Sequence, residues 1–185
     1  ALRKASESLE GLLLAGTINS IGIRRDAKAV DALAARLKDN DVEVACAAAV
    51  ALGRIGNAAA AESLRKSLLA TEGLVRSAVA EGTVLCAERL LAEGKSAESV
   101  VLYDLIRNAD VPKQRVIEAT RGAILARGKD GLPLLVEQLK SVDKQMFQLA
   151  LGTAREFPGT EIDKALVEEL SRATPDRAAL VIQAM

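Results

Sequence analysis

The chain has 185 residues, of which half are hydrophobic, with one tyrosine, two phenylalanines and neither tryptophan nor histidine. Its 25 lysines and arginines balance its 25 aspartates and glutamates, and a net charge of zero gives no overall attraction to nucleic acid or anionic membranes. The lack of histidine excludes Ser-His-Asp and Cys-His catalysis, and no apolar stretch reaches the roughly 18 residues of a membrane span. We therefore expect neither a catalytic residue nor a cofactor or metal site.

Five glycines divide the chain at intervals of 34, 38, 34 and 31 residues, and each follows one apolar helical segment and precedes another. They are Gly22, Gly56, Gly94, Gly128 and Gly159. A period in this range indicates a repeat architecture. We expect a single repeat domain over residues 1–185, with repeats at approximately 1–26, 27–57, 58–96, 97–130 and 131–160 and a partial last repeat at 161–185.

Within each repeat we expect two helices joined by a polar turn. The second helix is clearest over 44–56, where apolar residues recur at spacings of three and four and a glycine ends the segment. The first helices carry pairs of aliphatic residues four positions apart, which lie on one face. These pairs are Leu33 and Leu37, Leu64 and Leu68, Leu102 and Ile106, Leu135 and Leu139, and Leu166 and Leu170. The sequence predicts an all-α chain of about ten to eleven helices without a strand.

The two cysteines, Cys46 and Cys86, lie in comparable helices of consecutive repeats. This placement favours two buried thiols over a disulfide. Two thiols without histidine also make a poor metal site. They do not indicate a cellular compartment.

Two segments carry a resemblance to a known family. Segment 39–56 reads Asp-Asn-Asp-Val-Glu-Val-Ala-Cys-Ala-Ala-Ala-Val-Ala-Leu-Gly-Arg-Ile-Gly, and segment 74–78 reads Leu-Val-Arg-Ser-Ala. Both resemble HEAT-like repeats of the short bacterial kind named after phycobilisome lyases. In that family a Val-Arg pair opens the second helix, here at Val75 and Arg76, and Arg115 takes a similar place. The resemblance implies a right-handed α-α superhelix, a solenoid of about five helix pairs.

The resemblance covers roughly residues 9–176, and it implies a non-enzymatic scaffold that binds a partner protein or a neighbouring domain. The alternative is an accessory domain of a larger multidomain enzyme, which would position a catalytic domain or its substrate. Nucleic-acid binding, as in HEAT-like DNA glycosylases, is more distant because it needs a basic groove and aromatic residues. Bilin lyases share the repeat, but nothing here resembles a tetrapyrrole pocket. Because both ends enter helical pattern without caps, we expect a fragment of a larger bacterial protein.

The expected partner site is the concave groove lined by the second helices. In the family pattern, the residues six and ten positions before each glycine point into this groove. Here they are Leu12, Gly16, Cys46, Val50, Val84, Glu88, Glu118, Gly122, Leu149 and Thr153. Seven of the ten are apolar or glycine, which favours an apolar partner surface. Two other interpretations stay open: tight curvature buries these positions, or the register is wrong by one residue.

Overall fold

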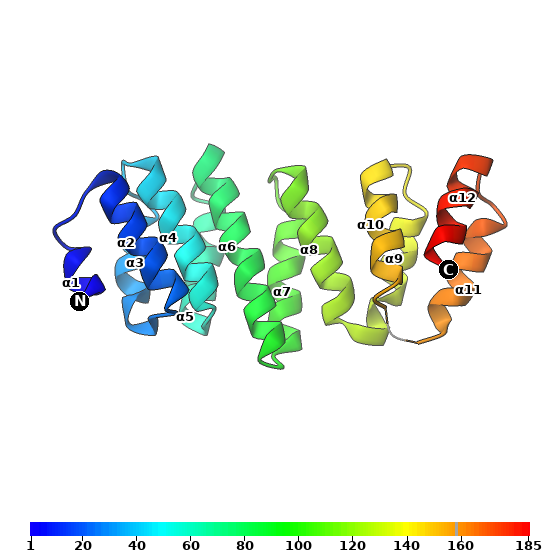
Figure 1. Cartoon of the computed structure of the whole chain (residues 1–185), viewed down its shortest axis with the longest axis horizontal. Helices are drawn as coiled ribbons and strands as arrows, with labels where there is room; N and C mark the ends of the chain where they lie inside the picture. Colours follow the sequence, from blue (N-terminus) through cyan, green and yellow to red (C-terminus); the bar gives the residue numbers. More distant parts are fainter. Residues whose placement is uncertain (158) are drawn as a thin grey trace. The chain divides into compact units, whose positions relative to one another are not determined.

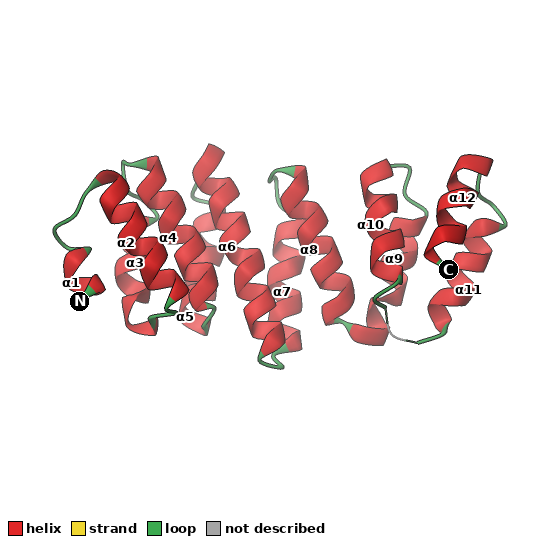
Figure 2. Cartoon of the chain, in the orientation of Figure 1, coloured by secondary structure: helices red, strands yellow, loops and turns green. Residues whose placement is uncertain are grey.

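The structure is a computed structural model that describes residues 1–157 and 159–185, and these residues form helices and turns without a strand (Figures 1 and 2). The elements are α1 (Leu2–Ala5), α2 (Gly11–Ile23), η1 (Ala27–Ala29), α3 (Val30–Arg36), α4 (Val42–Ile55), α5 (Ala58–Leu68), α6 (Gly73–Ala92), α7 (Ser96–Arg107), α8 (Lys113–Ala126), η2 (Gly128–Gly131), α9 (Leu132–Leu139), α10 (Lys144–Ala154), α11 (Glu161–Leu170) and α12 (Pro175–Ala184). The predicted all-α class is confirmed. The described residues hold twelve α-helices where ten to eleven were expected, and one of them is the four-residue α1.

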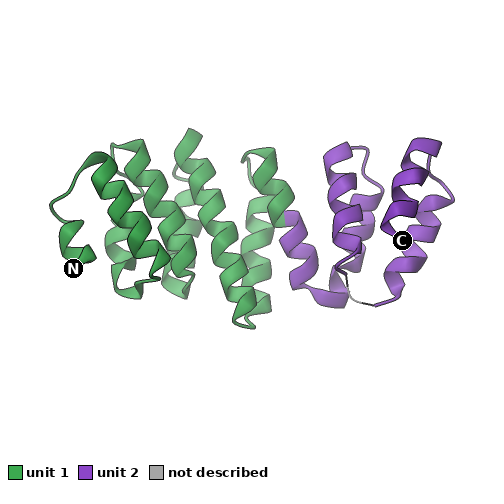
Figure 3. Cartoon of the chain, viewed as in Figure 1, with its two compact units in different colours: residues 1–119 green, residues 120–185 purple. Residues whose placement is uncertain are grey.

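The chain divides into two compact units, residues Ala1–Ala119 (unit 1) and Thr120–Met185 (unit 2), with the boundary inside α8 (Figure 3). Within unit 1, α2, α4 and α6 pack in one row, and α3, α5 and α7 pack in another. Within unit 2, α10 packs on α12 and α9 packs on α11. Each unit is therefore built as two layers, with the first helices of the repeats in one layer and the second helices in the other.

Two of the second helices begin at an aspartate in the polar turn that precedes them. The Asp41 carboxylate accepts a hydrogen bond from the Glu43 amide at 2.9 Å, and the Asp143 carboxylate accepts one from the Gln145 amide at 2.9 Å. Such caps satisfy amide groups that have no partner inside the first helical turn. The helices α2 and α6 begin differently: Glu10 and Glu72 precede glycines with φ of +53°, and neither glutamate caps its helix.

The predicted helix-ending glycines are confirmed at three of five positions. Gly56, Gly94 and Gly128 follow the ends of α4, α6 and α8 and have positive φ, the left-handed conformation that glycine adopts at low cost. Gly159 also has positive φ, but α10 ends at Ala154 with Arg155 as its C-cap, so Gly159 does not end that helix. Gly22 does not end a helix either, because it lies inside α2 and is buried. A Cβ atom there would approach the Cα atom of Ala51 in α4 to 2.7 Å, so this glycine permits close helix packing.

The cores consist mainly of small and aliphatic side chains, and the one tyrosine and two phenylalanines of the chain are buried as well. Nine of the ten paired aliphatic residues expected in the first helices are buried, and Leu170 is half-buried. In unit 1 the backbones of α4 and α6 touch, since a Cβ atom on Gly53 would overlap the carbonyl group of Gly82. Helices at such short separation leave no room for a large ring between them. This close approach also places the exposed sides of α2, α4 and α6 next to one another.

Candidate partner-binding face

The exposed sides of α2, α4 and α6 form one face of unit 1, which we call the second-helix face. Leu12 and Gly16 of α2 are exposed, and in α4 Glu43 is exposed while Cys46 and Val50 are half-buried. The α6 helix adds exposed Leu74 and half-buried Ser77, Glu81 and Leu85. Leu12 and Leu74 are the most open of the large apolar residues on this face, at 80 and 72% exposure.

The face follows a register that is set at the helix starts. Glu43, Cys46, Val50 and Arg54 of α4 have the same pattern of exposure as Leu74, Ser77, Glu81 and Leu85 of α6 when the helices are aligned on their first residues. The α6 helix has 20 residues and α4 has 14, so the additional residues of α6 extend its C-terminal end. Counting backwards from the glycines therefore misplaces the register in α6.

The structure places the predicted groove residues unevenly. In unit 1, Leu12, Gly16 and Glu88 are exposed, and Cys46, Val50 and Glu118 are half-buried. Val84 is buried because it lies on the side of α6 that faces the core, so the register there was wrong.

Three predicted residues belong to unit 2. Gly122 is buried, Leu149 is half-buried, and Thr153 is buried with its hydroxyl donating to the Leu149 carbonyl at 2.8 Å. Neither Gly122 nor Thr153 can therefore present a side chain to a partner. The structure brings together the candidates on α2, α4 and α6, and these define the site within unit 1.

The sequence contained an unused signal for the missed residues. The segments Glu10-Gly11-Leu12 and Glu72-Gly73-Leu74 are the same tripeptide, and both glycines have a φ of +53°. Alignment on these helix starts would have indicated Leu74, Ser77 and Glu81. The 38-residue interval between Gly56 and Gly94 is consistent with the length of α6, but it does not indicate which end of that helix is extended.

Carboxylates surround the half-buried thiol on this face. Burial raises the pKa of Cys46, and the charges of Glu43 and Glu81 raise it further. Since the thiolate is the reactive form, this environment does not activate Cys46 as a nucleophile. The described residues contain no cluster of three or more histidine, cysteine, aspartate or glutamate side chains that could hold a metal ion.

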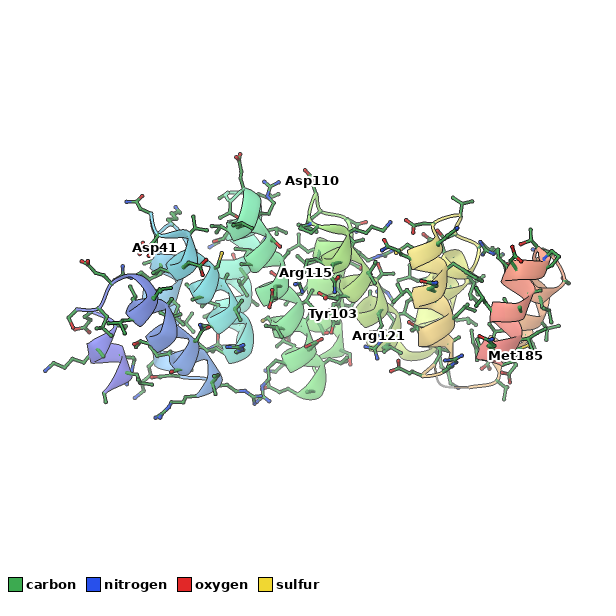
Figure 4. The ribbon with its side chains drawn as sticks, turned by 45° about the horizontal axis from the view of Figure 1, so that its top comes forward. Asp41, Tyr103, Asp110, Arg115, Arg121 and Met185 are labelled. Atoms are coloured by element: carbon green, nitrogen blue, oxygen red, sulfur yellow. The ribbon has the colours of Figure 1, made fainter. Side chains whose placement is uncertain are left out.

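The basic residues of the Val-Arg positions have structural partners. The Arg76 Nε atom donates to the Thr71 carbonyl at 2.6 Å and so ties the start of α6 to the preceding turn. Arg115, labelled in Figure 4, forms ion pairs with Glu81 at 3.2 Å and with Glu118 at 2.5 Å. Glu118, a predicted groove residue, is therefore engaged by its own helix.

The family model for HEAT repeats matches residues 2–82. Comparison with curated proteins gave no match. Within the described residues, no helix has the length and apolar character needed to cross a membrane.

Solved structures with a similar fold include two engineered proteins of the Northeast Structural Genomics Consortium. One is 20% identical, with 99% of this chain and 94% of that chain covered and a TM-score of 0.54. The other is 21% identical, with 99 and 56% covered and a TM-score of 0.50. The complex of CpcE and CpcF of phycocyanin lyase from Nostoc sp. PCC7120 is 20% identical, with 98 and 91% covered and a TM-score of 0.47, too low to support an argument. The chain thus has a fold similar to that of helical repeat proteins, and its residues 2–82 match the family model for HEAT repeats.

Proposed function

We propose that unit 1 is a protein-interaction module and that its second-helix face binds a segment of a partner protein or of a neighbouring domain. The observation that carries the proposal is the exposure of Leu12 and Leu74 beside the half-buried Cys46 and Val50. Large apolar side chains on one open face are typical of interaction surfaces. HEAT repeats typically serve as protein-interaction scaffolds, which supports the same conclusion.

The chemistry of this face supports binding more than catalysis. Its thiol, Cys46, has a raised pKa, and neither this thiol nor the Ser77 hydroxyl has a histidine beside it, since the chain has none. Glu81 is held in an ion pair with Arg115. The remaining open side chains are mainly aliphatic, and they can bury apolar area against a partner.

The test uses charge substitutions at open positions that leave the core intact. We expect Leu12→Glu and Leu74→Glu to abolish capture of a specific partner from an extract of the source cells. The matched control is Val101→Glu in α7, which changes a residue that is 60% exposed in the first-helix layer and should leave capture unchanged. Substitution of Val84 is unsuitable because that side chain is 6% exposed and a charge there would unfold the repeat. Equal capture by all three variants would exclude this face.

A further inference from the structure

The second-helix face ends in a cleft of about 400 Å³ at the C-terminal ends of α2, α4 and α6. Ile23, Leu85 and Ala92 supply apolar walls. Three arginines border the same cleft, Arg25 after α2, Arg54 in α4 and Arg89 in α6, together with Glu88. Three guanidinium groups against one carboxylate give this end of the face a net positive charge, unlike its carboxylate-bearing middle.

Arg89 is held in place by packing. Its side chain lies over Gly56, where a Cβ atom would overlap the Arg89 side chain, so the missing side chain of Gly56 makes room for it. Its NH2 group pairs with Glu93 at 2.8 Å, and Glu93 also pairs with Lys95 at 2.9 Å. One carboxylate therefore serves two cations, and the charge of Arg89 is only partly neutralised.

Arg25 and Arg54 form no side-chain hydrogen bond or ion pair within the described part of the chain. Arginines near helix C-termini are favourable because carbonyl groups there carry partial negative charge. That effect explains why an arginine is favourable at each helix end. It does not explain why the N–H donors of Arg25 and Arg54 lie at one concave site without an acceptor among the residues that the structure describes. A guanidinium fork matches the geometry of a carboxylate or phosphate group.

The charges along the face select between anionic partners. A nucleic acid carries a phosphate at every nucleotide and would continue from the cleft past the exposed Glu43, which repels it, and past Glu81, whose ion pair with Arg115 already engages that cation. A protein segment can carry one carboxylate and follow it with apolar residues, which suits Val50, Leu12 and Leu74 further along the face. The charge pattern therefore matches an acidic residue flanked by apolar residues.

We propose that the arginine cleft of α2, α4 and α6 binds an aspartate or glutamate side chain of the partner segment and fixes its orientation on the second-helix face. This inference rests on the proposed function, because the same segment would place its apolar residues on the exposed leucines. The apolar contacts supply affinity, and the arginines supply direction and selectivity. The two contributions can be removed separately.

The experiment is selection of peptides from a randomised twelve-residue display library on the immobilised full chain. We expect enriched peptides to carry aspartate or glutamate at a constant spacing from leucine, isoleucine or phenylalanine. The enriched peptides are then synthesised and their affinities measured. The double substitution Arg25→Gln/Arg54→Gln should lower the affinity for these peptides about tenfold or more. Arg54→Lys should lower it less, because lysine keeps the positive charge but cannot donate two parallel hydrogen bonds. The control is Arg65→Gln in α5, an exposed arginine paired with Glu62 away from the cleft.

Each outcome discriminates. Enriched peptides without acidic preference, or with unchanged affinity for the double variant, overturn the cleft proposal and leave the proposed function standing. No enrichment above an unrelated protein contradicts the proposed function and this inference together. Tighter binding of a twenty-nucleotide single-stranded DNA than of any peptide, lost in the double variant and falling steeply with salt, assigns the arginines to nucleic acid instead. Inorganic phosphate at millimolar concentration is also compared with unlabelled peptide as a competitor for the bound peptide. If phosphate displaces the bound peptide as effectively, the cleft is a site for free anions and the proposal is overturned.

Discussion

Two second helices, α6 in unit 1 and α10 in unit 2, have similar buried sides but different solvent-exposed sides. Both bury a stripe of small and apolar residues, such as Ala80 in α6 and Ala150 in α10. Their first open positions differ: Leu74 in α6 is apolar, whereas Lys144 and Gln145 in α10 are polar. The buried stripe follows from the repeat fold and the open side does not, so the open side of unit 1 is where we place function.

The two units also differ in how their helices are joined. Unit 1 brings backbones together at glycines, as at Gly53 and Gly82. Unit 2 uses a side chain: Arg177 of α12 donates to the Leu139 and Ser141 carbonyls at 2.6 and 2.9 Å and lies 3.7 Å from the centre of the Phe147 ring. A backbone contact has no space for an added atom, whereas a bridging side chain can be replaced with the loss of only its own hydrogen bonds and contacts. The following substitutions test that difference.

The largest effect is expected at the glycine contact. Gly53→Ala forces the backbones of α4 and α6 apart and should lower the free energy of unfolding by about 3 kcal/mol. Gly152→Ala in α10 meets no atom within 4 Å and should raise it by about 0.5–1 kcal/mol, because alanine favours helix. Urea unfolding followed by circular dichroism measures both, and Gly16→Ala, equally unobstructed in unit 1, is the control. A Gly53→Ala variant as stable as wild type would remove the backbone-contact account.

The arginine bridge of unit 2 should follow in size. Arg177→Met removes two hydrogen bonds to carbonyl groups, the ring contact and the ion pair with the buried Glu169, and should cost about 2–3 kcal/mol in unfolding free energy. Arg76→Met in unit 1 removes one hydrogen bond, to Thr71, and should cost about 1 kcal/mol. Thermal and urea unfolding of both variants measure the difference. An equal loss of unfolding free energy in the two variants would show that Arg177 does not provide the main stabilising contact between the helices of unit 2.

The two thiols, one in the core and one on the second-helix face, should make different contributions to the pH dependence of the free energy of unfolding. Burial, and then Glu93, raises the pKa of Cys86 from 9.0 to about 12. The unfolded chain therefore loses this proton first, so the thiol's contribution to stability is complete below pH 9 and is lost as the pH rises towards 12.

Between these limits, wild type should lose up to about 1.4 kcal/mol per pH unit more than Cys86→Ala. Cys46→Ala should change the slope less, because Cys46 is half-buried. Urea midpoints between pH 8.5 and 10.5 provide the measurement, and identical slopes for wild type and Cys86→Ala would contradict it. Native-state alkylation by a maleimide should correspondingly label Cys46 before Cys86.

The smallest effect is expected from open positions. Leu74→Glu in α6 and Gln148→Glu in α10 should each change the free energy of unfolding by at most about 0.5 kcal/mol, because neither side chain is part of a core. Only Leu74→Glu should affect partner binding. Paired stability and capture measurements on these two variants separate the roles of the two helices. Loss of binding in Gln148→Glu would extend the site into unit 2.

Much of the fold followed from local patterns. Spacings of three and four residues located the helices, and the predicted polar turns contain the aspartates that cap α4 and α10. The second-helix face was only partly predictable, because Leu12, Cys46 and Val50 were identified while Leu74 and Glu81 were missed. The error arose in α6, where a count from Gly94 reaches buried Val84. A helix turns 100° per residue, so an extension at one end rotates every position counted from that end.

The sequence by itself determined the all-α class, the repeat period, the helix ends at Gly56, Gly94 and Gly128, and the aliphatic cores, because these depend on backbone preference and periodicity. Tertiary structure decided that Gly22 is a packing contact, that unit 1 and unit 2 are separately compact, and that Arg25, Arg54 and Arg89 border one cleft. Those properties depend on which helices pack together and at which positions along their axes they touch. Local sequence does not encode these contacts, because they form only when separate repeats stack.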